Sequence, residues 1–260
     1  MNRRTLLRTL AGVTGATAIL GRDAQNEELH PAGMGIKAIA FDGFVIFDPR
    51  SVEKRMVELL PDKGLELAKL WRTRQFEYSW LRTAGDRYVD FWQVIDDALQ
   101  YSAKRLNVSL SNMQHDALMD SYRNLQPWPD VADGLAQLRR RGIKMAFLSN
   151  FTSAMLDANL KTAGLSEFFE FHMTTDRVRA YKPSPRAYEM GTEVLGLQKS
   201  TIAFAAFAPW DAVGAKWFGF PTVWVNRGAV QAEHLDAQPD AIAKDLSGLI
   251  EFIGERSRPM

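Results

Sequence analysis

The chain has 260 residues, of which 46% are hydrophobic, so it is long enough to bury one large core, with or without a smaller lobe. Its 32 lysine and arginine residues nearly balance its 31 aspartate and glutamate residues, which argues against nucleic acid as a partner and favours a small substrate. Cysteine is absent, which excludes disulfides, thiolate nucleophiles and cysteine-bound zinc, and the four histidines show no metal-ligand spacing.

Residues 1–34 have the composition of an export signal followed by a linker. Arg3, Arg4 and Arg8 precede a stretch without charged side chains that runs from residue 9 to Leu20. This pattern resembles a twin-arginine signal, whose apolar segment is too short to form a stable membrane span. An amphipathic N-terminal helix is the alternative. The signal would place a domain that begins near Gly35 in the periplasm or outside the cell.

The next part of the sequence changes from one apolar strand to a long helical segment. The strand is expected at residues 37–41 and ends at Asp42. Helical spacing then predicts four helices, at residues 52–60, 65–81, 88–106 and 112–125. We therefore expect a core domain made of residues 35–50 and 126–260, and a helical cap domain at residues 51–125.

Strands and helices alternate after Pro129, which is expected to occupy the first turn of a helix. Helices are predicted at residues 131–140, 153–163, 185–195 and 211–218, and strands at residues 144–148, 169–174, 202–206 and 222–225. This alternation predicts an α/β fold, a doubly wound parallel sheet with helices on both faces. Ligands bind such sheets beyond the carboxyl ends of the strands, so Asp42, Ser149–Asn150 and Trp210–Asp211 should meet in one crevice.

Asp42 is the first candidate for chemistry. It is followed by an apolar segment that includes Phe44 and Ile46, where a carboxylate would have little water and would need a nearby cation. Lys182, which precedes a proline, is the candidate cation. Taken singly, Asp42 is equally typical of a turn or a helix cap, and Lys182 of a solvated loop.

Four short motifs occur in the order found in a known superfamily. They are Asp42 after the first strand, Leu148-Ser149-Asn150, Tyr181-Lys182-Pro183 and Trp210-Asp211. Segments 71–82, 87–91 and 218–222 resemble more closely the type II (L-specific) 2-haloacid dehalogenases of the haloacid dehalogenase superfamily. The resemblance runs from about residue 37 to residue 252. It implies a Rossmann-like core with a helical cap inserted after the first strand.

The resemblance also implies a reaction, the hydrolytic removal of halide from short L-2-halocarboxylic acids. Asp42 would attack C2 with inversion, and water would hydrolyse the resulting aspartyl ester. Lys182 would keep Asp42 ionised and stabilise charge during attack. Arg72 would engage the substrate and the departing halide with help from Asn150, and Ser149 would bind the substrate carboxylate.

The remaining implied roles concern water and the pocket. Tyr188 would orient Lys182 or its neighbours, and Asp211 would position or activate the water that hydrolyses the ester. An apolar pocket that excludes competing water would be lined by Gly43, Phe44, Phe76, Phe91 and Trp210. No metal and no cofactor are expected, and the dimer usual in relatives predicts a homodimer.

Several of these residues also have a purely structural interpretation. Arg72 could pair with Glu66 or Glu77 on the surface of a helix. Asp211 could be the acidic residue of a first helical turn, where the helix dipole favours negative charge. Phe76 and Phe91 are more often core residues than pocket residues.

Three positions depart from the usual dehalogenase pattern. The first loop is one residue shorter, and Ile46 stands where threonine is usual. Ala206 and Ala208 stand where a serine and an asparagine usually precede Trp-Asp. These changes are expected to affect the support of the nucleophile and the positioning of water.

Two other functions remain open at this point. A phosphohydrolase of the same superfamily would need magnesium and a second aspartate two residues after the nucleophile, where this chain has Phe44. A dehalogenase-like protein that binds a small acid without turnover would explain the lost polar groups. The joint presence of Asp42, Arg72 and Lys182 argues against it, because a buried charged cluster is costly unless it is used.

Overall fold

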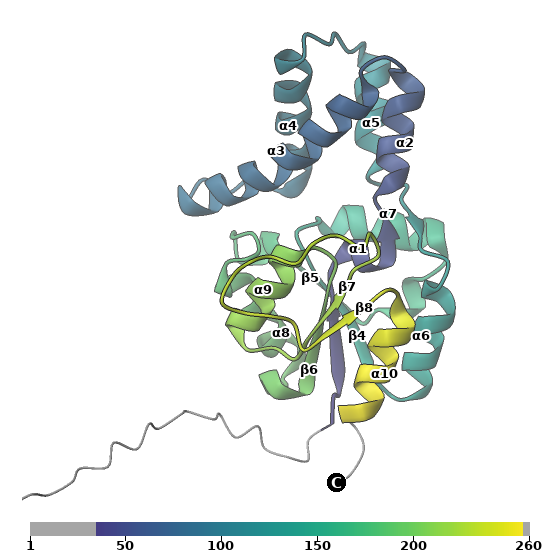
Figure 1. Cartoon of the computed structure of the whole chain (residues 1–260), viewed down its shortest axis with the longest axis vertical. Helices are drawn as coiled ribbons and strands as arrows, with labels where there is room; N and C mark the ends of the chain where they lie inside the picture. The colour runs from purple at the N-terminus through teal and green to yellow at the C-terminus, as the bar shows by residue number, and fades with distance from the viewer. Residues whose placement is uncertain (1–34, 257–260) are drawn as a thin grey trace, which may run out of the picture. The chain divides into compact units, whose positions relative to one another are not determined.

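A parallel sheet of six strands lies at the centre of the part of the chain that the computed structural model describes, residues 35–256 (Figure 1). The strand order is β5-β4-β1-β6-β7-β8, and every neighbouring pair is parallel. In chain order the strands are β1 (Ala38–Phe41), β4 (Lys144–Ser149), β5 (Phe171–Thr174), β6 (Ile202–Ala206), β7 (Thr222–Val225) and β8 (Ala241–Ala243). The prediction of a parallel α/β fold is confirmed.

Strand β1 occupies the middle of the sheet because it is apolar throughout and can be buried on both faces. All four of its residues are fully buried, and its Ala38 pairs with Lys144 of β4 and with Ile202 of β6. Its side chains alternate: Ile39 and Phe41 belong to one hydrophobic cluster, and the two alanines belong to the other. The sheet therefore has two separate cores, one on each face.

Helices cover both faces of the sheet. Figure 1 shows α8 and α9 on one side and α6 and α10 on the opposite side. The residues that α8 and α9 bury pack with the alanines of β1, whereas those of α6, α7 and α10 pack with Ile39 and Phe41. Their bounds are α6 (Val131–Arg140), α7 (Ser153–Ala163), α8 (Pro185–Leu195), α9 (Pro209–Phe218) and α10 (Leu246–Arg256).

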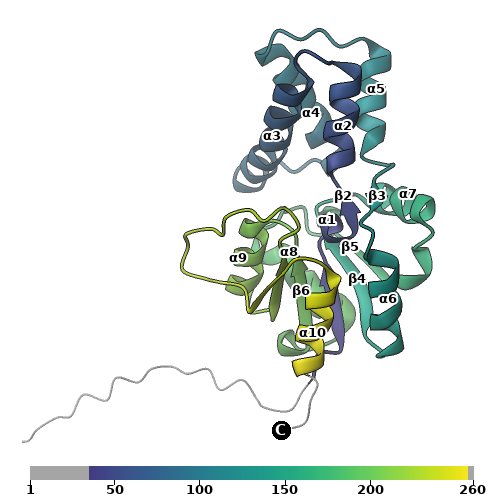
Figure 2. The same cartoon turned by 45° about the vertical axis from the view of Figure 1, so that its right-hand side comes forward.

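Four further helices stand together at the end of the sheet where β1 ends (Figures 1 and 2). They are α2 (Arg50–Leu59), α3 (Gly64–Ala84), α4 (Phe91–Arg105) and α5 (Asn112–Ser121). The indole of Trp71 in α3 donates a hydrogen bond of 2.8 Å to the carbonyl of Ile95 in α4. The two short antiparallel strands β2 (Phe47–Asp48) and β3 (Gln126–Pro127) pair where the chain enters and leaves this group of helices. That pair lies beside the limits predicted for the cap, residues 51–125.

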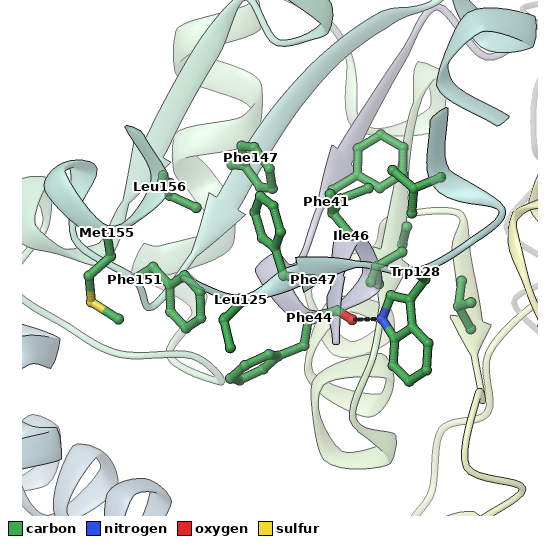
Figure 3. Packing of buried hydrophobic residues seen from close by; sticks show 14 of the residues in the cluster. Phe41, Phe44, Ile46, Phe47, Leu125, Trp128, Phe147, Phe151, Met155 and Leu156 are labelled. Carbon is green, nitrogen blue, oxygen red and sulfur yellow. Dashed lines mark hydrogen bonds between the residues drawn. The ribbon is translucent and has the colours of Figure 1, made fainter. Parts of the chain in front are cut away.

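The junction between these helices and the sheet is a packed aromatic layer. Figure 3 shows Phe44, Phe47 and Trp128 in this layer. The indole of Trp128 donates a hydrogen bond of 3.0 Å to the carbonyl of Phe44. Asn159 of α7 accepts a bond of 2.8 Å from the backbone of Leu125. The bond to Phe44 holds the segment that follows β1, on which the candidate site depends, and the bond to Asn159 holds the segment that returns from the helices.

Several predicted boundaries were wrong. Helix α4 begins at Phe91 rather than at residue 88, because Asp90 caps it by accepting from the amide of Gln93. Helix α9 begins two residues earlier than predicted, at Pro209. Pro129 lies before α6, since Asp130 is the N-cap. Helix α5 ends at Ser121 rather than at residue 125, and β5 begins at Phe171 rather than near residue 169.

Some elements were not predicted at all. They are the strands β2, β3 and β8, helix α10, and the short helix α1 (Gly43–Ile46) that directly follows the first strand. The predicted export signal at residues 1–34 lies outside the described residues. No helix within residues 35–256 has the length and apolar character needed to cross a membrane.

Candidate active site

Asp42 stands at the carboxyl end of β1, where the chain turns into helix α1. Its amide donates to the carbonyl of Ala205 in the neighbouring strand at 3.0 Å, and its Oδ1 accepts from the amide of Phe44 at 2.9 Å. Asp42 is thus the N-cap of α1, and the predicted cap role and the predicted site role fall on the same side chain. Only 9% of Asp42 is exposed, so its carboxylate has little access to water.

Lys182 lies between two carboxylates and is completely buried. Its Nζ donates to Asp42 Oδ2 at 2.7 Å and to Asp211 Oδ2 at 2.6 Å. Burial by itself lowers the pKa of Lys182, but the charges of Asp211 and Asp42 outweigh it, and the pKa is raised above the usual value. Lys182 is therefore a fixed positive charge. Its backbone amide donates to Asn150 Oδ1 at 3.2 Å, which ties the lysine segment to the end of β4.

Asp211 is the second carboxylate of this centre and lies in the first turn of α9. Burial and the nearby charge of Asp42 raise its pKa to about 6, although Lys182 and a hydrogen bond from Tyr188 act in the opposite direction. The hydroxyl of Tyr188 donates to Asp211 Oδ1 at 2.7 Å. Burial raises the pKa of Tyr188 well above its usual value, and the charge of Asp211 adds to this effect, so the tyrosine remains a donor. Tyr188 orients Asp211, and no hydrogen bond joins Tyr188 to Lys182.

A small cavity of about 20 Å³ lies over Asp42, about the space that one water molecule requires. Most of its lining is aromatic, and the rings of Phe44 and Phe151 meet edge to face at 5.0 Å. Ser149 accepts a hydrogen bond of 3.1 Å from the amide of Phe151 through its Oγ. The full lining is Asp42, Phe44, Phe76, Phe91, Ser149, Asn150, Phe151, Phe207, Ala208, Trp210 and Asp211.

The structure therefore brings most of the predicted site residues together. Lys182 and Tyr188 lie behind the two carboxylates rather than in the cavity wall. Gly43, which was predicted to line the pocket, is not part of the cavity wall. A β-carbon at this position would approach Ser149 Oγ to 3.1 Å and the ring of Phe151 to 3.3 Å, so a larger residue would press on two residues that line the cavity. The prediction that Asp42, Ser149–Asn150 and Trp210–Asp211 meet beyond the carboxyl ends of the strands is confirmed.

Arg72 does not line the cavity over Asp42. It lies on α3 and lines two adjoining cavities, and its guanidinium carbon is 5.9 Å from the centre of the Phe207 ring. Within residues 35–256 the guanidinium group has neither a hydrogen bond nor an ion pair with another residue. The alternative in which Arg72 pairs with Glu66 or Glu77 is therefore wrong for the described residues, and Glu77 pairs instead with Arg74 at 2.6 Å.

Three residues of the cavity wall were not predicted to line it: Phe151, Phe207 and Ala208. Each lies shortly after the end of β4 or β6, next to residues that were predicted for the site. Their position after these two strands is the signal that could have identified them. In the described part of the chain, no group of three or more histidine, aspartate or glutamate side chains is arranged to hold a metal ion.

A helical insertion directly after β1, and a lysine held by two aspartates at the carboxyl edge of a parallel sheet, define an α/β enzyme of the hydrolase class. Comparison with known proteins agrees. A model described as a haloacid dehalogenase-like hydrolase matches residues 5–219, and the chain belongs to this family.

Several of the similar proteins are described as dehalogenases. A protein described as (S)-2-haloacid dehalogenase from Pseudomonas sp. (strain YL) is 41% identical over 218 residues, 84% of this chain and 94% of the relative. Haloacetate dehalogenase H-2 from Moraxella sp. (strain B) is 34% identical over 84% of this chain and 98% of the relative. The solved structure of an L-2-haloacid dehalogenase from Xanthobacter autotrophicus with chloropropionic acid covalently bound is 30% identical, with a TM-score of 0.77 over 84% of this chain and 98% of that chain.

Proposed function

We propose that the protein hydrolyses short L-2-halocarboxylic acids to 2-hydroxy acids with inversion at C2, through an aspartyl ester on Asp42. The observation that carries this proposal is the position of Lys182, whose Nζ binds Asp42 at 2.7 Å with no exposure to solvent. A carboxylate that is ionised but poorly hydrated is a strong nucleophile toward carbon. The similarity to proteins described as (S)-2-haloacid dehalogenases supports the same reaction.

The first step is a displacement at C2. One oxygen of Asp42 attacks the carbon opposite to the carbon–halogen bond, a new C–O bond forms, and the halogen leaves with the bonding electrons as halide. Because the attack comes from the opposite side, the configuration at C2 inverts. Lys182 holds the carboxylate in place and balances its charge, so this step requires no metal ion.

The second step is hydrolysis of the ester. Water attacks the ester carbonyl carbon of Asp42 while Asp211 accepts a proton from the water. The bond between the carbonyl carbon and the substrate oxygen then breaks, and this oxygen takes the proton from Asp211 and leaves as the hydroxyl of the 2-hydroxy acid. The second proton of the water passes to solvent, which restores the carboxylate of Asp42. Asp211 suits this role because burial raises its pKa to about 6, closer to neutral pH than an ordinary aspartate.

The remaining residues bind the substrate. Ser149 lines the cavity over Asp42 and would bind the substrate carboxylate, and Asn150 would lie beside the halogen. Arg72 carries a positive charge without an anionic partner in the described structure, so we assign it to the substrate and the departing halide. Phe44, which lines both the cavity over Asp42 and the cavity beside Arg72, lies between the two groups.

Halide release in the presence of a chelator tests the proposal. The wild type should release chloride from L-2-chloropropionate and not from the D form, and Asp42→Asn should abolish release. Asp48→Asn is the matched control, because Asp48 lies outside the cavity and pairs with Arg50 instead. A single turnover in ¹⁸O-labelled water should place the label in the Asp42 peptide. Activity in Asp42→Asn would refute the proposal.

The same assays separate the two alternatives. Release of phosphate from phosphate esters that depends on magnesium, without halide release from haloacids, would indicate a phosphohydrolase. Binding of chloroacetate without halide release would indicate a binding protein that lacks turnover. Neither alternative has support of its own. Phe44 stands where a phosphohydrolase needs its second aspartate, and the Asp42–Lys182–Asp211 centre expected of a catalyst is joined by short hydrogen bonds.

We propose in addition that residues 1–34 direct export by the twin-arginine route and that the protein works in the periplasm as a homodimer. Arg3 and Arg4 before an uncharged stretch support the first proposal. Loss of export in an Arg3→Lys/Arg4→Lys variant, with activity retained in the cell interior, would test it. Light scattering coupled to size-exclusion chromatography would test the dimer.

A further inference from the structure

The cavity over Asp42 adjoins a much larger one. The larger cavity measures about 450 Å³, against about 20 Å³ for the cavity over Asp42. Four residues line both: Phe76, Phe207, Ala208 and Trp210. Three of these four are aromatic, and Ala208 alone among them is small. Among the residues that separate the two cavities, Ala208 therefore leaves the most space for a group to pass from one to the other.

The larger cavity is mainly apolar, and we call it the aromatic cavity. Its walls include Pro49, Phe76, Trp128, Phe207, Pro209 and Trp210. The rings of Phe76 and Trp210 meet at 5.4 Å and hold this wall in place. A concave surface of this size with aromatic walls binds apolar groups, because burial removes their surface from water.

Three arginines also border the aromatic cavity, but two of them are already neutralised. Arg227 binds both carboxylate oxygens of Asp130, at 2.7 and 3.0 Å, and Arg50 binds Asp48 at 2.6 Å. Both guanidinium groups lie against the ring of Trp128, at 4.5 Å for Arg50 and 4.7 Å for Arg227. Of these three arginines, only Arg72 has a charge that is available to a substrate. One positive charge can bind one negative group, either the carboxylate or the departing halide of a 2-halocarboxylic acid.

We infer that the protein accepts 2-halocarboxylic acids whose C2 carries a large apolar substituent, such as a benzyl group. The reacting carbon would lie over Asp42, and the substituent would pass Ala208 into the aromatic cavity. This inference rests on the proposed function and adds the substrate class to it. The bond changes are those already described, with halide leaving and an ester forming on Asp42.

A comparison of the reaction rates of two acids tests this inference. Halide release is measured for L-2-chloropropionate and for L-2-chloro-3-phenylpropionate, and kcat/KM is determined for each. We expect the wild type to give at least as high a kcat/KM for the phenyl acid. Val230→Trp adds bulk in the aromatic cavity alone, and Ala208→Leu raises the wall between the cavities. Each should lower the ratio of phenyl acid to chloropropionate by about tenfold or more.

The control for an added tryptophan is Val57→Trp. Val57 lies on α2, is 38% exposed and lines neither cavity, so this change should leave the ratio as in the wild type. An unchanged ratio in both Val230→Trp and Ala208→Leu would overturn the inference. The inference would also be overturned if the wild type turned over chloropropionate but gave a kcat/KM for the phenyl acid that is ten times lower.

The chemistry of the substituent is tested with a third acid. L-2-chlorosuccinate carries a second carboxylate in place of the apolar group. A clear preference for this acid would show that the arginines, rather than the aromatic walls, determine which substituent binds. That result would overturn the apolar assignment. Turnover of chloropropionate alone overturns this inference and leaves the proposed function intact. Absence of halide from all three acids overturns both.

Discussion

The hydrogen bond from Tyr188 to Asp211 should set the pH at which the ester is hydrolysed. The two oxygens lie 2.7 Å apart, and both residues are buried. Burial raises the pKa of Asp211, and this hydrogen bond acts against the rise, which leaves the pKa at about 6. Tyr188→Phe removes the donor and keeps the ring, which packs edge to face against Phe204 at 5.5 Å.

The size of the effect follows from the strength of the bond. A hydrogen bond to a charged group contributes about 1.5–3 kcal/mol, and one pKa unit corresponds to about 1.4 kcal/mol. The pKa of Asp211 should therefore rise by roughly one to two units in Tyr188→Phe. Since Asp211 must be ionised to accept a proton, the acidic limb of the ester-hydrolysis rate should move upward in pH by the same amount.

The assay is a rapid-quench single turnover with L-2-chloropropionate from pH 5 to pH 9, which follows decay of the aspartyl ester. Tyr122→Phe is the matched control, because its buried hydroxyl donates to Gln75 Oε1 at 2.9 Å and does not contact Asp211. The control should lose stability without a shift of the pH profile. A profile that stays in place in Tyr188→Phe would refute the role given to Asp211.

Three other changes test the charge centre and its support. Lys182→Met leaves two buried carboxylates without their cation, so it should abolish halide release and lower the free energy of unfolding by about 3–5 kcal/mol, measured by urea denaturation. In the wild type the pKa of Asp211 is raised from 3.8 to about 6 on folding, so stability should fall as the pH rises from about 4 to about 6. The loss is on the order of 3 kcal/mol, and Asp211→Asn should remove it; equal slopes in both proteins would contradict the assigned pKa. Trp128→Phe removes the bond to the carbonyl of Phe44 and should cost about 1 kcal/mol, and an unchanged urea midpoint would show that this bond contributes nothing.

The sheet and its helices were predictable because their local signals agree with their burial. Helix α8 begins at Pro185 and ends before Gly196, which adopts a left-handed conformation with φ of 62°. Both signals are visible in the sequence, and both boundaries were predicted correctly. Strand β6 is fully buried along its length, so a continuous apolar run was sufficient to identify it.

The elements that were missed depend on contacts between distant residues or on short segments. Helix α1 has only four residues and follows from the capping bond between Asp42 and Phe44. Strands β2 and β3 have two residues each and exist because they pair with one another. Helix α10 is different: Leu246, Leu249, Ile250 and Ile253 are spaced for one helical face, so this helix could have been predicted.

The sequence was sufficient to predict which residues form the charged centre, but not how they contact one another. The order of the motifs identified Asp42, Lys182 and Asp211, but nothing in the sequence shows that one lysine binds both aspartates. The place of Arg72 depends on how α3 lies over the sheet, which is set by tertiary contacts such as the bond of 3.0 Å from the amide of Tyr181 to Thr83 Oγ1. Periodicity within α3 carries no information about that contact.

The three departures from the usual dehalogenase pattern do not have the same consequence. Ile46 and Ala206 are completely buried and belong to the two hydrophobic clusters, so at these positions the chain has gained packing where a polar group is usual. Ala208 alone lines the cavity over Asp42. With an apolar side chain at this position, we propose that Asp211, which lines the same cavity, positions the water of the second step. Asp211 is suited to this role because its two oxygens are held by different residues. Tyr188 donates to Oδ1 at 2.7 Å, and Lys182 donates to Oδ2 at 2.6 Å.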